Sequence, residues 1–322
     1  KVFSGYIGDV YQNKKKLAFA GYSASVVYKI MLLLAASWQG VLAARVVDRT
    51  GKGIRTAPRD ALVAQSSDGG QLGGSFGLHK MLDMAGSALG VIFAYFFIAT
   101  DFGYHKAFLF SIIPAVIGIA IIFAVREDKS CISKCEKISL KGLRLDGKLK
   151  AYLAVIFVFC LGNSSNAFLL LKAQDRGFSA SQVILLYLVF NVAASALALP
   201  MGQLSDKLGR SKILVPGYLI YGCVYLGFAL LSAKAAVPLL FIAYGAYTAL
   251  IGGAERAFIV ERAPGQLKGT VLGLYGMIQG IGLLLSSMIA GLLWEQVDSD
   301  APFLFGGLIG IGSAIMIRAI LD

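Results

Sequence analysis

Ten apolar segments run through this chain of 322 residues, and each is long enough to cross a lipid bilayer as a helix, which needs about 20 residues. Residues 1–8 look like the end of a further helix. The segments are rich in Gly, Ala and Leu and do not alternate with period two, so they predict helices and not barrel strands. The sequence therefore predicts an all-α membrane protein. The ten segments lie at 17–34, 36–63, 74–99, 106–125, 151–171, 180–203, 213–232, 236–262, 270–294 and 302–320.

The composition excludes several other classes of protein. Hydrophobic residues make up 57% of the chain and charged residues 15%, whereas a soluble domain has about 45–50% and about 25%. The chain is too apolar to remain disordered in water. Its net charge of +12 comes from basic residues in short connectors between apolar segments. This distribution is typical of the cytoplasmic loops of membrane proteins, and no nucleic-acid partner is expected.

The longest connector, 126–150, divides the chain into two parts. It holds eight Lys or Arg and four Asp or Glu. We therefore expect an N-terminal bundle at 1–125, a central loop at 126–150 and a C-terminal bundle at 151–322. The connectors on the side of this loop carry seventeen Lys or Arg and the opposite connectors carry four. The central loop is thus predicted to be cytoplasmic, in a protein of the plasma (inner) membrane.

An internal repeat relates the two parts. Residues 5–15 read GYIGDVYQNKK and residues 202–212 read GQLSDKLGRSK, 197 positions apart. QLGGSFGL from Gln71 matches QLKGTVLGL from Gln266 at an offset of 195, with one residue inserted. Two unrelated strings that share nearly one offset indicate a duplication with a period near 196. Because the second copy holds six helices, the chain is expected to lack its first helix and most of the second.

The repeated pattern between the second and third helix of each half resembles a motif of the major facilitator superfamily. The resemblance implies two six-helix bundles, a transporter that works by alternating access, and a conformational role for the motif, which latches the halves in one state. Gln12 replaces the motif's usual glycine in the first copy. The string RTGKGIRTAPRDAL resembles a generic bacterial efflux-type branch. The matching residues are Gly5, Asp9, Lys14 and Lys15 in the first copy and Gly202, Asp206, Gly209, Arg210 and Lys212 in the second.

Six charged residues share one face of the span 36–63. At about 100° per residue they occupy an arc of about 120°. A charge in mid-membrane costs at least about 2.5–3.5 kcal/mol, so these side chains must face a watery cavity or ion partners. Arg45, Arg49 and Lys52 are predicted to line a path for an anionic or polar solute. Arg55 and Arg59 fit either that path or a structural gate with carboxylates such as Asp9 or Asp60.

Titratable residues within the spans are candidates for proton coupling. Asp83 lies about 14 Å into its predicted helix, counted at 1.5 Å per residue. A buried carboxyl with a raised pKa can bind a proton in each cycle, which makes Asp83 the first candidate and Asp48 the second. A permanent pair of Asp83 with Lys or Arg is the alternative. Glu255 with Arg256 lies nearer the cytoplasmic side and is predicted to act in gating.

Uncharged polar residues interrupt the spans of the second half. They require partners in hydrocarbon, so either substrate contact or hydrogen bonds between helices would explain them. Asn163-Ser164-Ser165-Asn166 lies midway along one span, and two Tyr–polar pairs are spaced four residues apart on others. The predicted substrate residues of this half are Asn163, Asn166, Tyr187, Asn191 and Gln279.

Together these features predict a secondary-active transporter of a small polar or anionic solute, coupled to protons. It would act as a monomer in the bilayer, without cofactor or metal, and not as an enzyme. The alternative is a membrane-embedded enzyme or lipid-handling protein whose basic stripe holds a phosphate. No nucleophile–base set, metal-ligand spacing or phosphate-binding loop supports that alternative. A passive channel fits poorly, because duplicated halves suit rocking around a central site.

Overall fold

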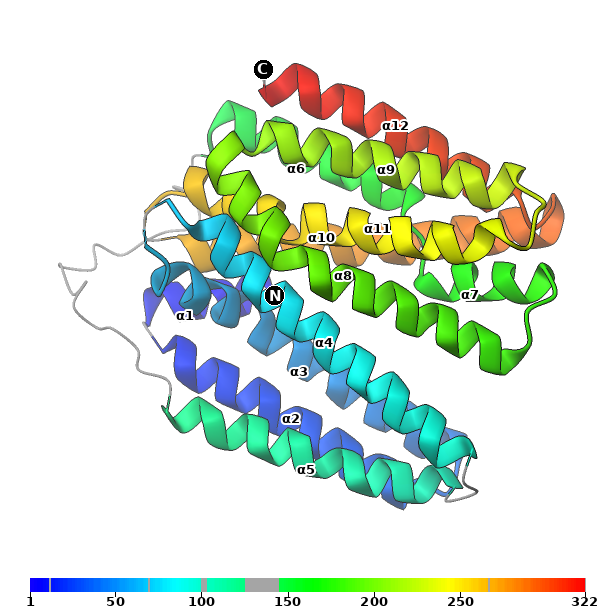
Figure 1. The fold of residues 1–322 in the computed structure, drawn as a ribbon. Helices are drawn as coiled ribbons and strands as arrows, with labels where there is room; N and C mark the ends of the chain where they lie inside the picture. The colour runs from blue at the N-terminus through cyan, green and yellow to red at the C-terminus, as the bar shows by residue number, and fades with distance from the viewer. Residues whose placement is uncertain (12, 69, 100–102, 125–144, 266, 322) are drawn as a thin grey trace. The chain divides into compact units, whose positions relative to one another are not determined.

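The computed structural model is helical almost throughout the residues that it describes, which are 1–11, 13–68, 70–99, 103–124, 145–265 and 267–321. Most of the predicted central loop lies outside these ranges. Figure 1 shows the helices, and their bounds are α1 (Val2–Val10), α2 (Lys14–Leu34), α3 (Trp38–Gln65), α4 (Leu72–Ala99), α5 (Gly103–Ala124), α6 (Gly147–Gly162), α7 (Asn166–Asp175), α8 (Ala180–Leu208), α9 (Ser211–Leu230), α10 (Ala236–Arg262), α11 (Lys268–Gln296) and α12 (Ala301–Leu321).

Nine spans within the described ranges are long and apolar enough to cross a membrane: α2, α4, α5, α6 together with α7, and α8 to α12. The tenth predicted span forms α3, which is 28 residues long but carries too many charges to qualify. Its N-terminus is set by Ser37, whose side chain accepts a hydrogen bond from Gly40 N at 3.4 Å. The helical fold of this segment therefore agrees with the prediction, although its composition differs from that of the other spans.

The predicted span 151–171 is broken into two helices. α6 ends at Gly162 and α7 begins at Asn166. The side chain of Ser165 accepts a hydrogen bond from Ala167 N at 3.3 Å, which caps the second helix. Short polar side chains compete with the backbone ladder in this way, so the polar cluster that interrupts the span also ends the helix.

The helices group into two compact units that interleave along the chain. The first comprises residues 1–66, 93–145 and 263–277, and the second comprises 67–92, 146–262 and 278–322. α4 and α11 therefore contribute to both units. The bundles at 1–125 and 151–322 stay a prediction, because this grouping follows compactness and not the order of the sequence.

In the first unit, α2 packs against α3 and α5 (Figure 1). Small residues bring α2 and α3 together: a methyl group on Gly51 would lie 2.7 Å from the Ala24 side chain. On the other face of α2, the rings of Phe19 and Phe123 meet edge to face with centroids 5.2 Å apart. Packing through small and aromatic residues is typical of helices in lipid, where van der Waals contact drives association.

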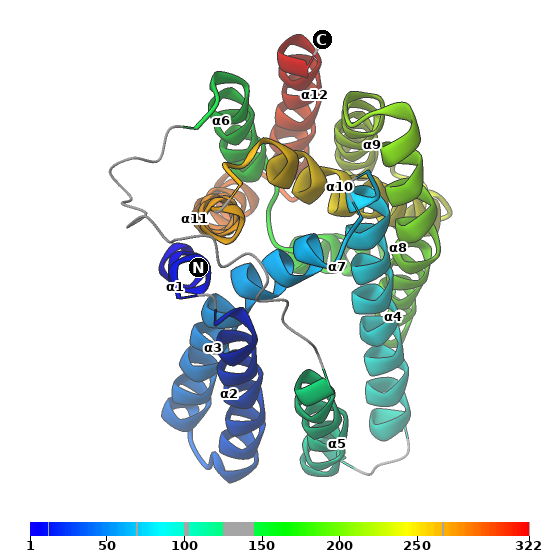
Figure 2. The same cartoon turned by 90° about the vertical axis from the view of Figure 1, so that its left-hand side faces the viewer.

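In the second unit, α12 lies between α6 and α9, as Figure 2 shows, and α8 packs on α10. Gly162 and Gly306 let α6 and α12 approach at backbone distance, since a methyl on Gly162 would lie 3.1 Å from the Gly306 Cα. Between these helices the rings of Phe159, Tyr221 and Tyr225 are fully or almost fully buried. This aromatic core holds the helices that carry the polar residues of the second half.

Candidate functional site

The carboxylate of Asp9, at the end of α1, caps the N-terminus of α11. Its two oxygens accept hydrogen bonds from Gly269 N at 3.2 Å, from Thr270 N at 2.7 Å and from the Thr270 hydroxyl at 2.8 Å. Asp9 is buried, and Lys14 lies 3.8 Å from it. The first N–H groups of a helix have no partner within the helix and carry partial positive charge, so a carboxylate is stabilised there.

Asp206, near the end of α8, makes the equivalent contact with the N-terminus of α4. It accepts hydrogen bonds from Gly73 N at 2.8 Å and from Gly74 N at 2.6 Å. The guanidinium of Arg210 lies 2.7 Å from the same carboxylate. Asp206 is therefore held on one side by a helix N-terminus and on the other by a cation, as Asp9 is.

The two repeats that the sequence contains thus contact each other crosswise. Each aspartate of one repeated string binds the helix start that belongs to the other repeated string, in the opposite copy. Glycines make the approach possible: a methyl group on Gly5 would overlap the Gly269 carbonyl, and one on Gly202 would overlap the Gly73 carbonyl. The sequence revealed both repeats but not this pairing. Their nearly equal offset showed that they belong to one duplication but did not indicate that they are in contact.

The turn after Asp206 depends on Gly209. Its φ of +95° lies in the region that favours glycine, and it ends α8 just before α9 begins. In the first copy the corresponding Gln12 lies outside the described residues. The second motif therefore has the tight turn that its glycine predicts.

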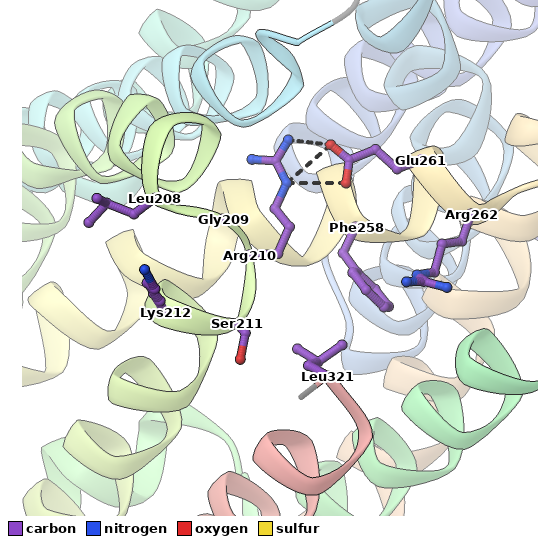
Figure 3. Close-up of a pocket in the computed structure, with 9 residues that line it drawn as sticks. All are labelled: Leu208, Gly209, Arg210, Ser211, Lys212, Phe258, Glu261, Arg262 and Leu321. Atoms are coloured by element: carbon purple, nitrogen blue, oxygen red, sulfur yellow. Dashed lines mark hydrogen bonds and ion pairs between the residues drawn. The ribbon is translucent and has the colours of Figure 1, made fainter.

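Arg210 also binds Glu261, a residue that the sequence did not single out. Figure 3 shows the guanidinium beside this carboxylate, with Nε 3.2 Å from Oε1. Burial alone would lower the pKa of Arg210, but the Glu261 and Asp206 carboxylates outweigh it and raise that pKa above its usual value. Arg210 therefore stays charged at every physiological pH. The open pocket beside it has a volume of about 580 Å³, and its lining also includes Leu208, Gly209, Ser211, Lys212, Phe258, Arg262 and Leu321.

The cations of α3 fall into two groups. Arg45 and Lys52 are exposed, and the side chain of Arg49 is 65% exposed. The Arg45 guanidinium lies 5.8 Å from the centre of the Tyr28 ring, and Arg49 lies 3.6 Å from the carboxylate of Asp48. These three side chains therefore extend beyond the packed face of the helix, and their lining of a solute path stays a prediction.

Arg55 and Arg59 are instead held inside the first unit. The Arg55 guanidinium donates a hydrogen bond to the Ser25 hydroxyl at 2.8 Å and lies 4.3 Å from the centre of the Tyr22 ring. Arg59 donates to the Asp60 carboxylate at 3.0 and 3.1 Å. Of the two interpretations of this pair, these contacts favour the structural one.

The candidate proton-coupling residues differ in burial. The sequence predicted a buried Asp83, but in the structure its side chain is exposed. α4 begins at Leu72, and the direction of the Asp83 side chain depends on which neighbours cover that face of the helix. Asp48 is buried, and so is Glu255, which accepts a hydrogen bond from the Tyr218 hydroxyl. Arg256, the other predicted gating residue, is half-buried.

The polar residues of the second half lie against tyrosines. The Asn163 amide donates to the Tyr247 hydroxyl at 3.5 Å, and the Tyr244 hydroxyl donates to the Asn166 amide oxygen at 2.9 Å. Asn191 donates to the Tyr187 carbonyl at 2.7 Å, and its own amide oxygen is buried without a hydrogen-bond partner among the described residues. Tyr187 and Gln279 are half-buried. In the same ranges, no cluster of three His, Cys, Asp or Glu side chains is arranged to hold a metal.

A buried lysine, which the sequence did not identify, lies at the end of α7. Lys172 is 2% exposed and donates to Asp175 at 3.0 Å and to Ser299 at 2.6 Å. It also lies 2.8 Å from Asp300, which Arg176 contacts at 3.3 Å. This network ties α7 to the connector between α11 and α12.

Replacing Lys172 by methionine is expected to destabilise the protein by about 1–2 kcal/mol. Removing one partner of a buried pair can cost more, but both carboxylates are partly exposed and keep water as a partner. Thermal unfolding of the purified protein in detergent measures the effect. Lys212→Met, at an exposed lysine, is the matched control, and equal unfolding temperatures for the two variants would contradict the prediction.

Comparisons with known proteins agree with this architecture. The chain is 32% identical to an uncharacterised MFS-type transporter of Methanocaldococcus jannaschii, over 98% of this chain and 81% of that protein. Its fold is similar to that of the human organic anion transporter MFSD10, with a TM-score of 0.83, 13% identity, and coverage of 98% of this chain and 79% of that one. It is also similar to the Escherichia coli fucose:proton symporter FucP, with a TM-score of 0.76, 12% identity, and coverage of 99% and 86%. The family model of the Major Facilitator Superfamily matches residues 1–147 and 151–322, and the chain therefore belongs to this superfamily of multi-pass membrane transporters.

Proposed function

We propose that this transporter moves a small polar or anionic solute by alternating access, and that protons drive the movement. The observation that carries the proposal is the crosswise pairing of the two motifs, in which Asp9 caps α11 and Asp206 caps α4. Each contact is compact and polar, and it is made by a residue of one copy on a helix of the other. Such contacts can form in one state and break in another, so they bias a two-state equilibrium.

The gate would consist of both motifs and the charges around them. Lys14 and Arg210 hold the aspartates in place, and Gly5, Gly202 and Gly209 permit the close approach and the turn. Glu255 and Arg256 on α10 are proposed to act with the second motif, because Gly253, two residues before Glu255, lies against the start of α4. We place this end of the helices and the loop 126–150 on the cytoplasmic side of the plasma (inner) membrane, and we propose a monomer.

The proposed substrate contacts come from both copies. Arg45, Arg49 and Lys52 of α3 provide positive charge that is exposed along the helix, which suits an anionic group on the solute. In the second copy, Asn163 and Asn166 lie at the break between α6 and α7, where the helix leaves polar groups available. Tyr187, Asn191 and Gln279 complete the proposed set.

Proton coupling in the first copy is proposed to involve Asp48 or Asp83. Asp48 is the better placed of the two, since it is buried and has a cation, Arg49, 3.6 Å away. A carboxyl in such surroundings can exchange a proton as its contact with the cation changes. Asp83, which is exposed, would have to be covered in another state of the cycle.

Proteoliposomes test this function. An imposed pH gradient is expected to drive accumulation of a substrate found by screening organic anions and neutral polar solutes. Asp48→Asn is expected to reduce the response to the gradient at least tenfold, because the amide binds no proton. Glu295→Gln, at an exposed glutamate of α11, is the control and should behave as the wild type. Transport that ignores the pH gradient in the wild type would refute the coupling.

A further inference from the structure

We infer that Glu255 is a proton-binding carboxyl in the second copy, and that its protonation loosens α4 from α8 and α10. This inference rests on the proposed proton coupling but names a residue on a different helix from Asp48 and Asp83. Glu255 is 4% exposed and lies in α10, where Arg256 follows it and the residues from Leu250 to Ala254 and from Ala257 to Val260 are uncharged. A buried carboxyl is retained only where its charge is compensated or where it binds a proton.

The surroundings of Glu255 include a phenol that stabilises its ionised form. Tyr218, on α9, is fully buried and donates its hydroxyl proton to the Glu255 carboxylate. The charge of Glu255 also interacts electrostatically with Tyr152 and Cys160 of α6 and with Tyr247 of α10. None of these neighbours carries a positive charge, so compensation has to come from another helix or from Arg256, the next residue in the chain.

The helix that brings a cation to this part of α10 is α4. The Lys80 side chain lies against Gly252, where an added methyl group would be 3.0 Å from Lys80 Cγ. Gly252 precedes Glu255 by three residues, a rise of about 4.5 Å, which a lysine side chain can span. His79, the neighbouring titratable residue of α4, is half-buried. The charge of Lys80 thus belongs to the environment that decides whether Glu255 is ionised.

The same part of α4 makes the contacts of the second motif. Gly73 and Gly74 donate to Asp206, and Gly77 packs directly on the Ala198 carbonyl of α8. If water delivers a proton to the Glu255 carboxylate, its charge changes from −1 to 0 and the attraction for Lys80 disappears. Binding of one proton would therefore weaken the hold of α10 on α4 and release the helix start that Asp206 caps.

A buried aromatic cluster connects Glu255 with the break between α6 and α7. The centroid of the Phe159 ring lies 4.5 Å from that of Tyr218 and 4.7 Å from that of Tyr221. The ring centroids of Tyr221 and Tyr225 are 4.2 Å apart. The Tyr152 hydroxyl interacts with Tyr218, and the Tyr225 hydroxyl interacts with Tyr221, Ser164 and Tyr244. The cluster therefore lines the region between Glu255 and the break with buried hydroxyl groups, of which that of Tyr221 donates to the Gly162 carbonyl.

Infrared spectroscopy of the protein in lipid nanodiscs tests the inference without knowledge of the substrate. A carboxylic-acid C=O band that titrates with pH is expected in the wild type and in Glu295→Gln, and it should be lost in Glu255→Gln. Tyr218→Phe and Lys80→Met each remove a group that favours the ionised form, so each should raise the midpoint pH of this band by about one unit.

Hydrogen exchange of residues 72–80 provides the conformational readout. We expect faster exchange at low pH in the wild type, after correction for the intrinsic rate, and fast exchange at all pH values in Glu255→Gln. A titrating band that persists unchanged in Glu255→Gln, or exchange that does not respond to pH, overturns the inference. If Glu255→Gln loses the band but its transport still responds to the pH gradient as in the wild type, the inference is overturned and the proposed function stands. A band with the expected behaviour in a protein whose transport ignores the gradient would refute the proposed coupling alone.

Discussion

Replacing Asp9 by alanine is expected to lower transport at least tenfold. The carboxylate accepts three hydrogen bonds at the start of α11, and all three are buried. Each buried donor that loses its partner costs about 1–3 kcal/mol, and about 1.4 kcal/mol already changes an equilibrium tenfold. The state in which α1 and α11 are joined would therefore be depopulated, and the cycle would stall on one side.

Graded variants separate this effect from misfolding. Thr270→Val removes one donor and leaves two hydrogen bonds, so its effect should be smaller than that of Asp9→Ala. Lys14→Met removes only the cation, 3.8 Å away, and should have the smallest effect. Initial rates in proteoliposomes, normalised to folded protein, measure all three. Wild-type rates for Asp9→Ala would show that the contact does not bias the cycle.

A valine at position 202 is expected to cost at least about 3 kcal/mol of stability and to abolish transport. Even a methyl group there would overlap the Gly73 carbonyl and lie 3.0 Å from the Gly77 Cα. Overpacking of side chains costs about 1–3 kcal/mol, and here the obstacle is backbone that cannot rotate away. α4 and α8 would have to separate, which also breaks the hydrogen bonds to Asp206.

Gly291→Val is the matched control, because a methyl group at Gly291 meets nothing within 4 Å. Thermal unfolding in detergent and transport in proteoliposomes should distinguish the two variants. Gly5→Val is expected to behave like Gly202→Val, since Gly5 meets Gly269 in the same way. If Gly202→Val and Gly291→Val unfolded at the same temperature, the close approach of α4 and α8 would be refuted.

The helical spans could be predicted because hydrocarbon imposes one rule on every segment. Backbone groups that have no access to water must be paired within the segment, so length and hydropathy alone identify a helix. The rule does not describe interactions between side chains. It therefore did not predict that Asn163 to Ser165 end one helix and begin another, or that Lys172 is buried among carboxylates.

In the candidate site, too, helix geometry could be predicted from the sequence, whereas contacts between helices could not. A helical wheel placed six charged residues on one arc of α3, because the angle per residue is a property of the helix, and of these Arg45, Arg49 and Lys52 are exposed. It could not tell that Arg55 would meet Ser25 and Tyr22, or that Asp83 would be exposed. These outcomes depend on which helix covers which face, and that information is not local.

The duplicated strings carried the most long-range information in the chain. Their common offset established two related copies and marked Asp9 and Asp206 as equivalent residues. It did not reveal that each aspartate binds the helix start of the other copy, because an offset records ancestry and not proximity. Each aspartate lies at the helix start of the other copy for two reasons. Glycines let the pairs of helices approach at backbone distance, and the buried N–H groups at the helix starts require an acceptor.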